Sequence, residues 1–138
     1  MKVLITGENS YVGKNIGNFL LYKNMEVKYV SVRNGISEDE FTGVDTVVHC
    51  AAIVHKKEAK FATLYDKVNY ELTVDIAKKA KKKGVKQFVF MSTMAVYGKS
   101  QGEINSNTPL QPKTLYGESK LKAERALEKI ADENFKVS

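Results

Sequence analysis

The chain opens on the run Lys2-Val3-Leu4-Ile5-Thr6-Gly7-Glu8-Asn9-Ser10-Tyr11-Val12-Gly13, and this run decides the fold. Its apolar triplet stops at a Thr-Gly pair, which is typical of a short strand buried on both faces. Beyond it, Ile16, Phe19 and Leu20 recur at helical spacing, and residues 26–32 are rich in Val and Tyr, as strands are. A strand, a helix and a second strand in this order form the first step of a parallel sheet.

The rest of the chain continues this alternation. Strands are predicted in residues 44–52, 87–91 and 135–137, and helices over 61–83 and 116–131. An apolar stripe at steps of four is predicted to bury the first of these helices, through Leu64, Val68, Leu72, Ile76 and Ala80. Only about eleven residues separate the second strand from the third, which is short for a crossover with its own helix and strand. We therefore expect one domain, residues 1–138, with a Rossmann-like, doubly wound parallel α/β sheet and a reduced or missing strand after the second.

The turn after the first strand has the spacing Gly-x-x-Ser-x-x-Gly, from Gly7 through Ser10 to Gly13. Free backbone N–H groups at a helix start, with the helix dipole behind them, hold a dinucleotide pyrophosphate well. Glycines let the backbone turn tightly and approach the phosphates. The alternative is an ordinary strand-to-helix turn in which a Ser or Asn side chain caps the helix.

A second set of residues carries acid–base chemistry: Tyr116, Lys120 and Thr93. Tyr116 and Lys120 are four apart, so a helix places them on one face. A nearby ammonium favours the phenolate, and lowering the tyrosine pKa from about 10 towards 7 requires about 4 kcal/mol. Such a tyrosine can take a hydroxyl proton while hydride leaves the same carbon, and Thr93 could hydrogen-bond the same oxygen. Alone, the pair is weak evidence, because tyrosine and lysine at this spacing occur by chance on many helices.

Five stretches in order along the chain resemble the extended short-chain dehydrogenase/reductases, particularly bacterial nucleotide-sugar epimerases and dehydratases. They are Leu4-Ile5-Thr6-Gly7 to Gly13, Val47-Val48-His49-Cys50-Ala51-Ala52, Val68-Asn69, Phe88-Val89-Phe90-Met91-Ser92-Thr93-Met94-Ala95-Val96-Tyr97-Gly98 and Tyr116-Gly117-Glu118-Ser119-Lys120. The resemblance implies that Tyr116 is the catalytic acid/base, that Lys120 binds the nicotinamide ribose and tunes the tyrosine, and that Thr93 is the hydroxyl partner. It further implies a cofactor site formed by Gly7, Ser10, Tyr11, Val12, Gly13, Ala51, Ala52 and Lys120, and an asparagine, Asn69, that shapes the substrate site.

Two positions depart from the family pattern. Ser10 stands where the middle glycine is usual, and its small hydroxyl could meet a phosphate. An acidic residue about twenty positions beyond the glycines would mark NAD. The second strand instead ends Val30-Ser31-Val32-Arg33, and Arg33 could pair with the 2′-phosphate of NADP. The expected cofactor is therefore NAD or NADP, with Arg33 either a selector or a surface residue.

Family members continue beyond this length with further strands and a smaller lobe that grips the sugar nucleotide. The chain is therefore either a truncated product or part of a longer protein, and we expect little or no turnover from it alone. The resemblance implies an enzyme acting on a nucleotide sugar by hydride transfer; Met94, where dehydratases tend to have Glu, favours an epimerase or reductase. The alternative is a redox sensor that holds a dinucleotide without chemistry. A homodimer through residues 61–83 and 116–131 is implied by analogy.

Composition narrows the remaining classes of function. The formal charge is +6, but the densest basic run, at residues 78–83, sits at a helix end without aromatic residues, so we expect no nucleic-acid partner. The single cysteine, Cys50, excludes an intrachain disulfide, and it is expected in the core. His49 and His55 lack partners at metal-ligand spacing and are predicted to be structural or surface residues, while Met91 and Met94 are expected to pack. With no signal peptide and no membrane-length apolar run, the expected location is cytoplasmic.

Overall fold

The computed structural model describes residues 1–54 and 61–138. In these residues the strands are β1 (Lys2–Thr6), β2 (Glu26–Val30), β3 (Thr46–His49), β4 (Gln87–Phe90) and β5 (Lys136–Val137). They form one parallel sheet in the order β2-β1-β3-β4-β5. The predicted doubly wound α/β fold is confirmed, and the strand ends differ from the predicted ones by at most three residues.

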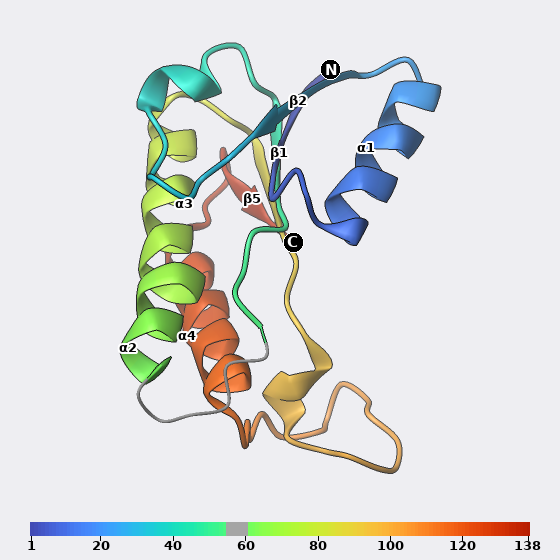
Figure 1. Ribbon diagram of the computed structural model, residues 1–138, viewed down its shortest axis with the longest axis vertical. Coiled ribbons are helices and arrows are strands. Elements are labelled where there is room, and N and C mark those ends of the chain that lie inside the picture. Colours follow the sequence, from blue (N-terminus) through green and yellow to red (C-terminus); the bar gives the residue numbers. More distant parts are fainter. Residues whose placement is uncertain (55–60) are drawn as a thin grey trace.

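Helices cover both faces of this sheet (Figure 1). Helix α1 (Tyr11–Tyr22) lies on one face, and α3 (Leu72–Lys82) and α4 (Leu115–Ile130) lie on the other. The larger core cluster fills the side of α3 and α4, where Leu4, Val47, Ile76 and Phe88 are fully buried. A smaller cluster under α1 is built on Val3, Ile5 and Val48. All inner residues of β1 are buried, as its apolar triplet predicts.

The predicted reduction after β2 is confirmed, because β2 is the edge strand of the sheet. Residues 31–45 contain only the short 3-10 helix η1 (Glu38–Phe41) in place of a helix and a further strand. Phe41 is fully buried in the larger core cluster. The half-buried Glu38 and the exposed Asp39 pair with Lys82 and Lys83 at the end of α3. Residues 31–45 thus cover the part of the core that a crossover with its own helix and strand would otherwise cover.

The predicted helix over residues 61–83 is present as three consecutive parts, α2 (Ala62–Tyr65), the π-helix η3 (Asp66–Glu71) and α3. The predicted apolar stripe is wrong over its first half: Leu64 is exposed and Val68 half-buried, whereas Tyr65, Asn69 and Thr73 are buried. The wider π turns rotate the buried face by about one residue. The stripe is correct from Leu72 onward: Leu72 is half-buried against the larger core cluster, and Ile76 and Ala80 are fully buried.

Two smaller expectations also need correction. Met94 is 61% exposed and does not pack in the core, because it begins the short 3-10 helix η4 (Met94–Tyr97). Cys50 is half-buried at the end of β3 rather than in the core interior. The prediction for His55 lies outside the described residues.

The basic run at the end of α3 is held in ion pairs. Lys79 pairs with Asp75, Lys81 with Asp132, and Lys82 and Lys83 with the acids of η1. These lysines fasten α3 to its neighbours, which favours the structural interpretation of the run over an electrostatic footprint for nucleic acid.

Candidate functional site

The turn between β1 and α1 has the geometry of an anion cradle. Gly7 has a φ of 77°, and a Cβ there would lie 2.9 Å from the backbone nitrogen of Ala51, so this position needs glycine. Ser10 caps α1, its Oγ accepting a 2.9 Å hydrogen bond from the Gly13 N–H. In the described part of the chain, no acceptor meets the N–H groups of Tyr11 and Val12. Two free donors at the positive end of the helix dipole favour an anionic group at this turn.

A cleft of about 430 Å³ opens beside this turn, at the carboxyl ends of β1, β2 and β3. It brings together five of the predicted cofactor residues, namely Gly7, Ser10, Arg33, Ala51 and Ala52. Tyr11 and Val12 are absent from its lining and have exposed side chains, so they could contribute only backbone groups. Gly13 lies buried beneath the turn. Parallel sheets bind ligands at this carboxyl edge.

At the end of β2, Ser31 and Arg33 line one wall of the cleft. Arg33 is exposed, and no ion pair holds its guanidinium in residues 1–54 and 61–138. Ser31 supplies no carboxylate to repel a phosphate. This wall therefore carries the Arg33 guanidinium at the position where an acidic side chain would bind the ribose 2′-hydroxyl of NAD.

Lys120 is nearly completely buried on α4, with 1% of its surface exposed. Its Nζ lies 3.9 Å from the centroid of the Phe90 ring, a cation–π contact at the end of β4. Burial lowers the pKa of Lys120 from 10.5 to about 8, against the opposing effect of the Glu124 carboxylate and a smaller one from the neighbouring Cys50. Cys50 also lines the cleft, so it links the cleft wall to the lysine.

Tyr116 begins the same face of α4, one helical turn before Lys120. Its ring is half-buried and lies 6.4 Å from the ring of Tyr65, between centroids. The start of α4 is pressed onto η4: a Cβ at Gly117 would lie 2.7 Å from the carbonyl oxygen of Ala95. Thr93 caps η4, its Oγ1 accepting from the Ala95 N–H at 3.2 Å. The backbone segments that carry Tyr116 and Thr93 are thus in contact.

Asn69 is fully buried in the π-helix η3, where its side chain ties three segments together. Its Oδ1 accepts from the Ile53 N–H at 2.8 Å, and its Nδ2 donates to the Ile53 carbonyl and the Ser119 hydroxyl, each at 3.1 Å. Ser119 in turn donates to the Tyr116 carbonyl at 2.9 Å. Asn69 therefore fixes the wall of the cleft relative to α4.

His49 lies at the centre of a buried hydrogen-bond chain. Its Nδ1 is 2.7 Å from Thr6 Oγ1, and its Nε2 is 3.0 Å from Thr73 Oγ1. Because Thr73 donates its own proton to the Asn69 carbonyl, His49 must donate from Nε2 and accept at Nδ1. Thr6 Oγ1 also accepts from Ala51 N–H at 3.4 Å. The chain connects the cleft wall to η3 and confirms a structural role for His49.

Acid is expected to destabilise the chain through His49. Burial, with a smaller contribution from Lys120, lowers its pKa from 6.5 to about 3. The neutral ring therefore contributes stability that is complete above pH 6.5 and is lost as the pH falls towards 3. The free energy of unfolding should fall by up to about 1.4 kcal/mol per pH unit in this window.

This prediction is checked by urea unfolding between pH 7 and pH 4. His49→Gln keeps a donor and an acceptor but does not titrate, so its stability should fall less steeply over the same window. Equal slopes for the two proteins would show that His49 does not control the acid response.

Five residues that line the cleft were not predicted from the sequence as cofactor-binding residues: Asn9, Cys50, Ile53, Val68 and Leu72. Ile53 continues the strand end that carries Ala51 and Ala52, so its position was the available signal. Val68 and Leu72 were predicted to lie in the core from their spacing, and both line the cleft. Val68 does so from the π-helix η3, and Leu72 from the first position of α3, where it also packs against the larger core cluster. No group of three or more His, Cys, Asp or Glu side chains in the described ranges could hold a metal ion.

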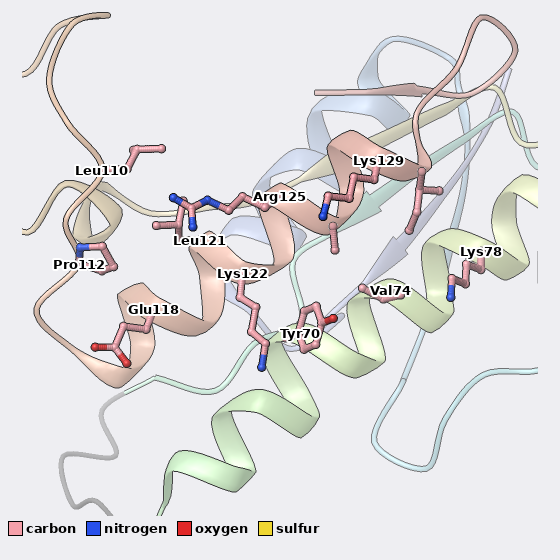
Figure 2. Close-up of a pocket in the computed structure, with 12 residues that line it drawn as sticks. Tyr70, Val74, Lys78, Leu110, Pro112, Glu118, Leu121, Lys122, Arg125 and Lys129 are labelled. Carbon is pink, nitrogen blue, oxygen red and sulfur yellow. The ribbon is translucent and has the colours of Figure 1, made fainter.

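A larger groove, about 690 Å³, lies outside this site, between η3, α3 and α4 (Figure 2). Tyr70 and Val74 form one side, and Leu121, Lys122 and Arg125 form the other. None of the predicted catalytic or cofactor residues lines it. No helix of the described residues is long and apolar enough to span a membrane.

The parallel sheet, the glycine turn and the cleft at the strand ends define a Rossmann-type nucleotide-binding architecture. The sequence profile of the NAD dependent epimerase/dehydratase family matches residues 3–138. The chain belongs to this family.

Among its curated relatives, UDP-glucose 4-epimerase of Vibrio cholerae is 31% identical over 156 residues, covering 96% of this chain and 48% of the relative. The chain spans about half the length of the curated relatives it matches. Among solved structures, MoeE5 in complex with UDP-glucose and NAD has a TM-score of 0.89 at 24% identity, covering 100% of this chain and 52% of that one. The Bordetella bronchiseptica enzyme WbmG in complex with NAD has a TM-score of 0.78 at 26% identity, covering 94% and 49%.

Proposed function

We propose that this chain is the cofactor-binding part of a cytoplasmic, NAD(P)-dependent nucleotide-sugar epimerase. The observation that carries the proposal is the cleft at the β1–α1 turn, which Cys50 links to the buried Lys120. The fit to a dinucleotide is supported by the free N–H groups of Tyr11 and Val12 and by the bare backbone at Gly7. The likeness to UDP-glucose 4-epimerase supports the substrate class.

In this proposal the bound cofactor supplies the hydride acceptor, and the chain supplies the proton transfer. Tyr116 takes the proton of a sugar hydroxyl, and Lys120 lies one helical turn away on α4. Thr93 hydrogen-bonds the same oxygen from the segment that α4 contacts. Asn69 acts by holding the cleft wall and α4 in register, since all its polar side-chain atoms are occupied. Met94 leaves no carboxylate beside Thr93, which favours epimerisation or reduction over dehydration.

Calorimetric titration of the chain with NAD and NADP tests the cofactor part of this proposal. We expect both to bind in the micromolar-to-millimolar range, and Arg33→Ala to weaken NADP about tenfold more than NAD, because only NADP has a 2′-phosphate. Arg125→Ala, on the far groove, is the matched control and should change neither affinity. Absence of binding at millimolar concentration of both cofactors would contradict the proposal.

The second candidate is a redox sensor that binds a dinucleotide without chemistry. The retained Tyr116, Lys120 and Thr93 argue against it. Tyr116→Phe separates the two: an enzyme loses reduction of NAD by UDP-glucose but keeps its NAD affinity. The chain spans about half the length of the curated relatives it matches, so we propose that residues 1–138 alone have little turnover. The reaction is therefore to be followed in a protein that contains both halves.

We also propose a homodimer through residues 61–83 and 116–131. Its support is the groove of Figure 2. The lining of this groove includes the apolar residues Val74, Leu121 and Ile130. Sedimentation velocity over a series of protein concentrations measures the association, and a sedimentation coefficient that stays that of a monomer at every concentration would contradict it.

A further inference from the structure

One face of α4 carries three functional groups at intervals of four residues: Tyr116, Lys120 and Glu124. The first two belong to the proposed acid–base pair, but the role of Glu124 is unassigned. Its Oε1 accepts a short hydrogen bond from the hydroxyl of Ser92. Ser92 directly follows the β4 strand end and precedes Thr93, so this bond joins α4 to the segment that carries the third proposed catalytic group.

The environment of Lys120 explains why a carboxylate is needed there. A buried ammonium loses its hydration, and this loss favours the neutral amine. The groups that act on it are Phe90 from β4, His49 from β3, Cys50 just beyond β3, and Glu124 from α4. Tyr116 lies one helical turn before it on α4. His49 is held neutral and burial raises the pKa of the Cys50 thiol, so neither supplies a negative charge at neutral pH.

Glu124 is thus the carboxylate in this set. Its charge acts to raise the pKa of Lys120, and it is the larger of the two opposing effects on that lysine. Its hydrogen bond to Ser92 restricts the carboxylate to the side of α4 that faces β4. A glutamate on the next turn, Glu128, is exposed and has no such effect.

We propose that Glu124, held by Ser92, is a positioning residue that keeps the buried Lys120 ammonium charged one turn from Tyr116. This inference rests on the proposed function for its catalytic meaning, because that function assigns Lys120 as the charged partner of Tyr116. Glu124 thus joins Tyr116 and Lys120 on one face of α4, and Ser92 orients the Glu124 carboxylate. The resulting order is Ser92, Glu124, Lys120, Tyr116.

The test is direct titration of Lys120 by NMR of the chain with 13C-labelled lysines, without cofactor or substrate. The signal is assigned by its loss in Lys120→Met. We expect the Lys120 midpoint in Glu124→Gln to fall below the wild-type midpoint, and Ser92→Ala to move it in the same direction by a smaller amount. Glu128→Gln, the matched control, should leave it unchanged.

An unchanged midpoint in Glu124→Gln would overturn the inference, as would an equal shift in Glu128→Gln. Ser92→Ala keeps every charge, so it provides the same readout if Glu124→Gln fails to fold. The titration needs no ligand, so its failure is distinguishable from the failure of the proposed function, which calorimetry with NAD reports independently.

Discussion

Replacing Lys120 with methionine is expected to raise the free energy of unfolding at pH 7 by about 2–3 kcal/mol and to weaken NAD binding about tenfold. The folded chain holds Lys120 at a pKa of about 8, against 10.5 when exposed. Each unit is worth about 1.4 kcal/mol, and the lost cation–π contact with Phe90 reduces the gain. The lower affinity follows from the proposed bond between Lys120 and the nicotinamide ribose, worth about 1–1.5 kcal/mol.

The stability gained in Lys120→Met is expected to depend on pH. A depressed lysine pKa means that the charged form destabilises the fold, fully below pH 8 and progressively less up to pH 10.5. The advantage of Lys120→Met should therefore be constant from pH 6 to 8 and disappear by about pH 10.5. Urea unfolding at a series of pH values measures it.

Lys122→Met is the matched control, since Lys122 lies on the same helix with its side chain 49% exposed and paired to Asp66. Its stability should change by less than about 0.5 kcal/mol. If Lys120→Met is destabilised at pH 7, burial of the charge is not the dominant cost at this position. A buried lysine that lowers the stability of the fold is expected where the residue is needed for function rather than for stability.

The first strand and the turn that follows it could be predicted from sequence because their signals are local. An apolar triplet, a Thr-Gly pair and a helix start occur within thirteen residues, and each is confirmed by the structure. The reduced crossover after β2 was also predictable, because chain length alone limits what residues 31–45 can form. The meeting of five cofactor positions in one cleft was predictable as well, because these residues follow parallel strands whose carboxyl ends lie at one edge of the sheet.

The helix from residue 61 to 83 shows where such prediction fails. Apolar spacing cannot reveal a π segment, since its extra residue per turn is stabilised by tertiary contacts rather than by local preference. Asn69 and Thr73 are buried because they satisfy His49, Ile53 and Ser119, which are far away in sequence. Burial of polar residues depends on such hydrogen-bond partners, and the spacing of apolar residues along the sequence contains no information about them. The contact between Ser92 and Glu124 escaped prediction for the same reason.

Substituting Gly13 with alanine is expected to lower NAD affinity at least 100-fold, which corresponds to about 2.7 kcal/mol. A Cβ at Gly13 would lie 2.9 Å from the carbonyl oxygen of Gly7 and 2.8 Å from Ser10 Oγ. The hydroxyl could rotate away, but the carbonyl belongs to the backbone of the turn, so the turn itself must open. Opening displaces the free N–H groups of Tyr11 and Val12, which are the proposed pyrophosphate donors.

Gly17→Ala provides the control on the same helix. Its Cβ would overlap the hydroxyl end of the Tyr29 ring, but this side chain is 38% exposed and can swing outward. Helix propensity also favours alanine there by up to about 1 kcal/mol. We therefore expect Gly17→Ala to keep its NAD affinity within about threefold, or about 0.6 kcal/mol, in the calorimetric titration that shows the loss in Gly13→Ala. Circular dichroism must show both variants folded. A folded Gly13→Ala chain with unchanged affinity would mean that the pyrophosphate is held elsewhere, because the turn could not open without moving its donors.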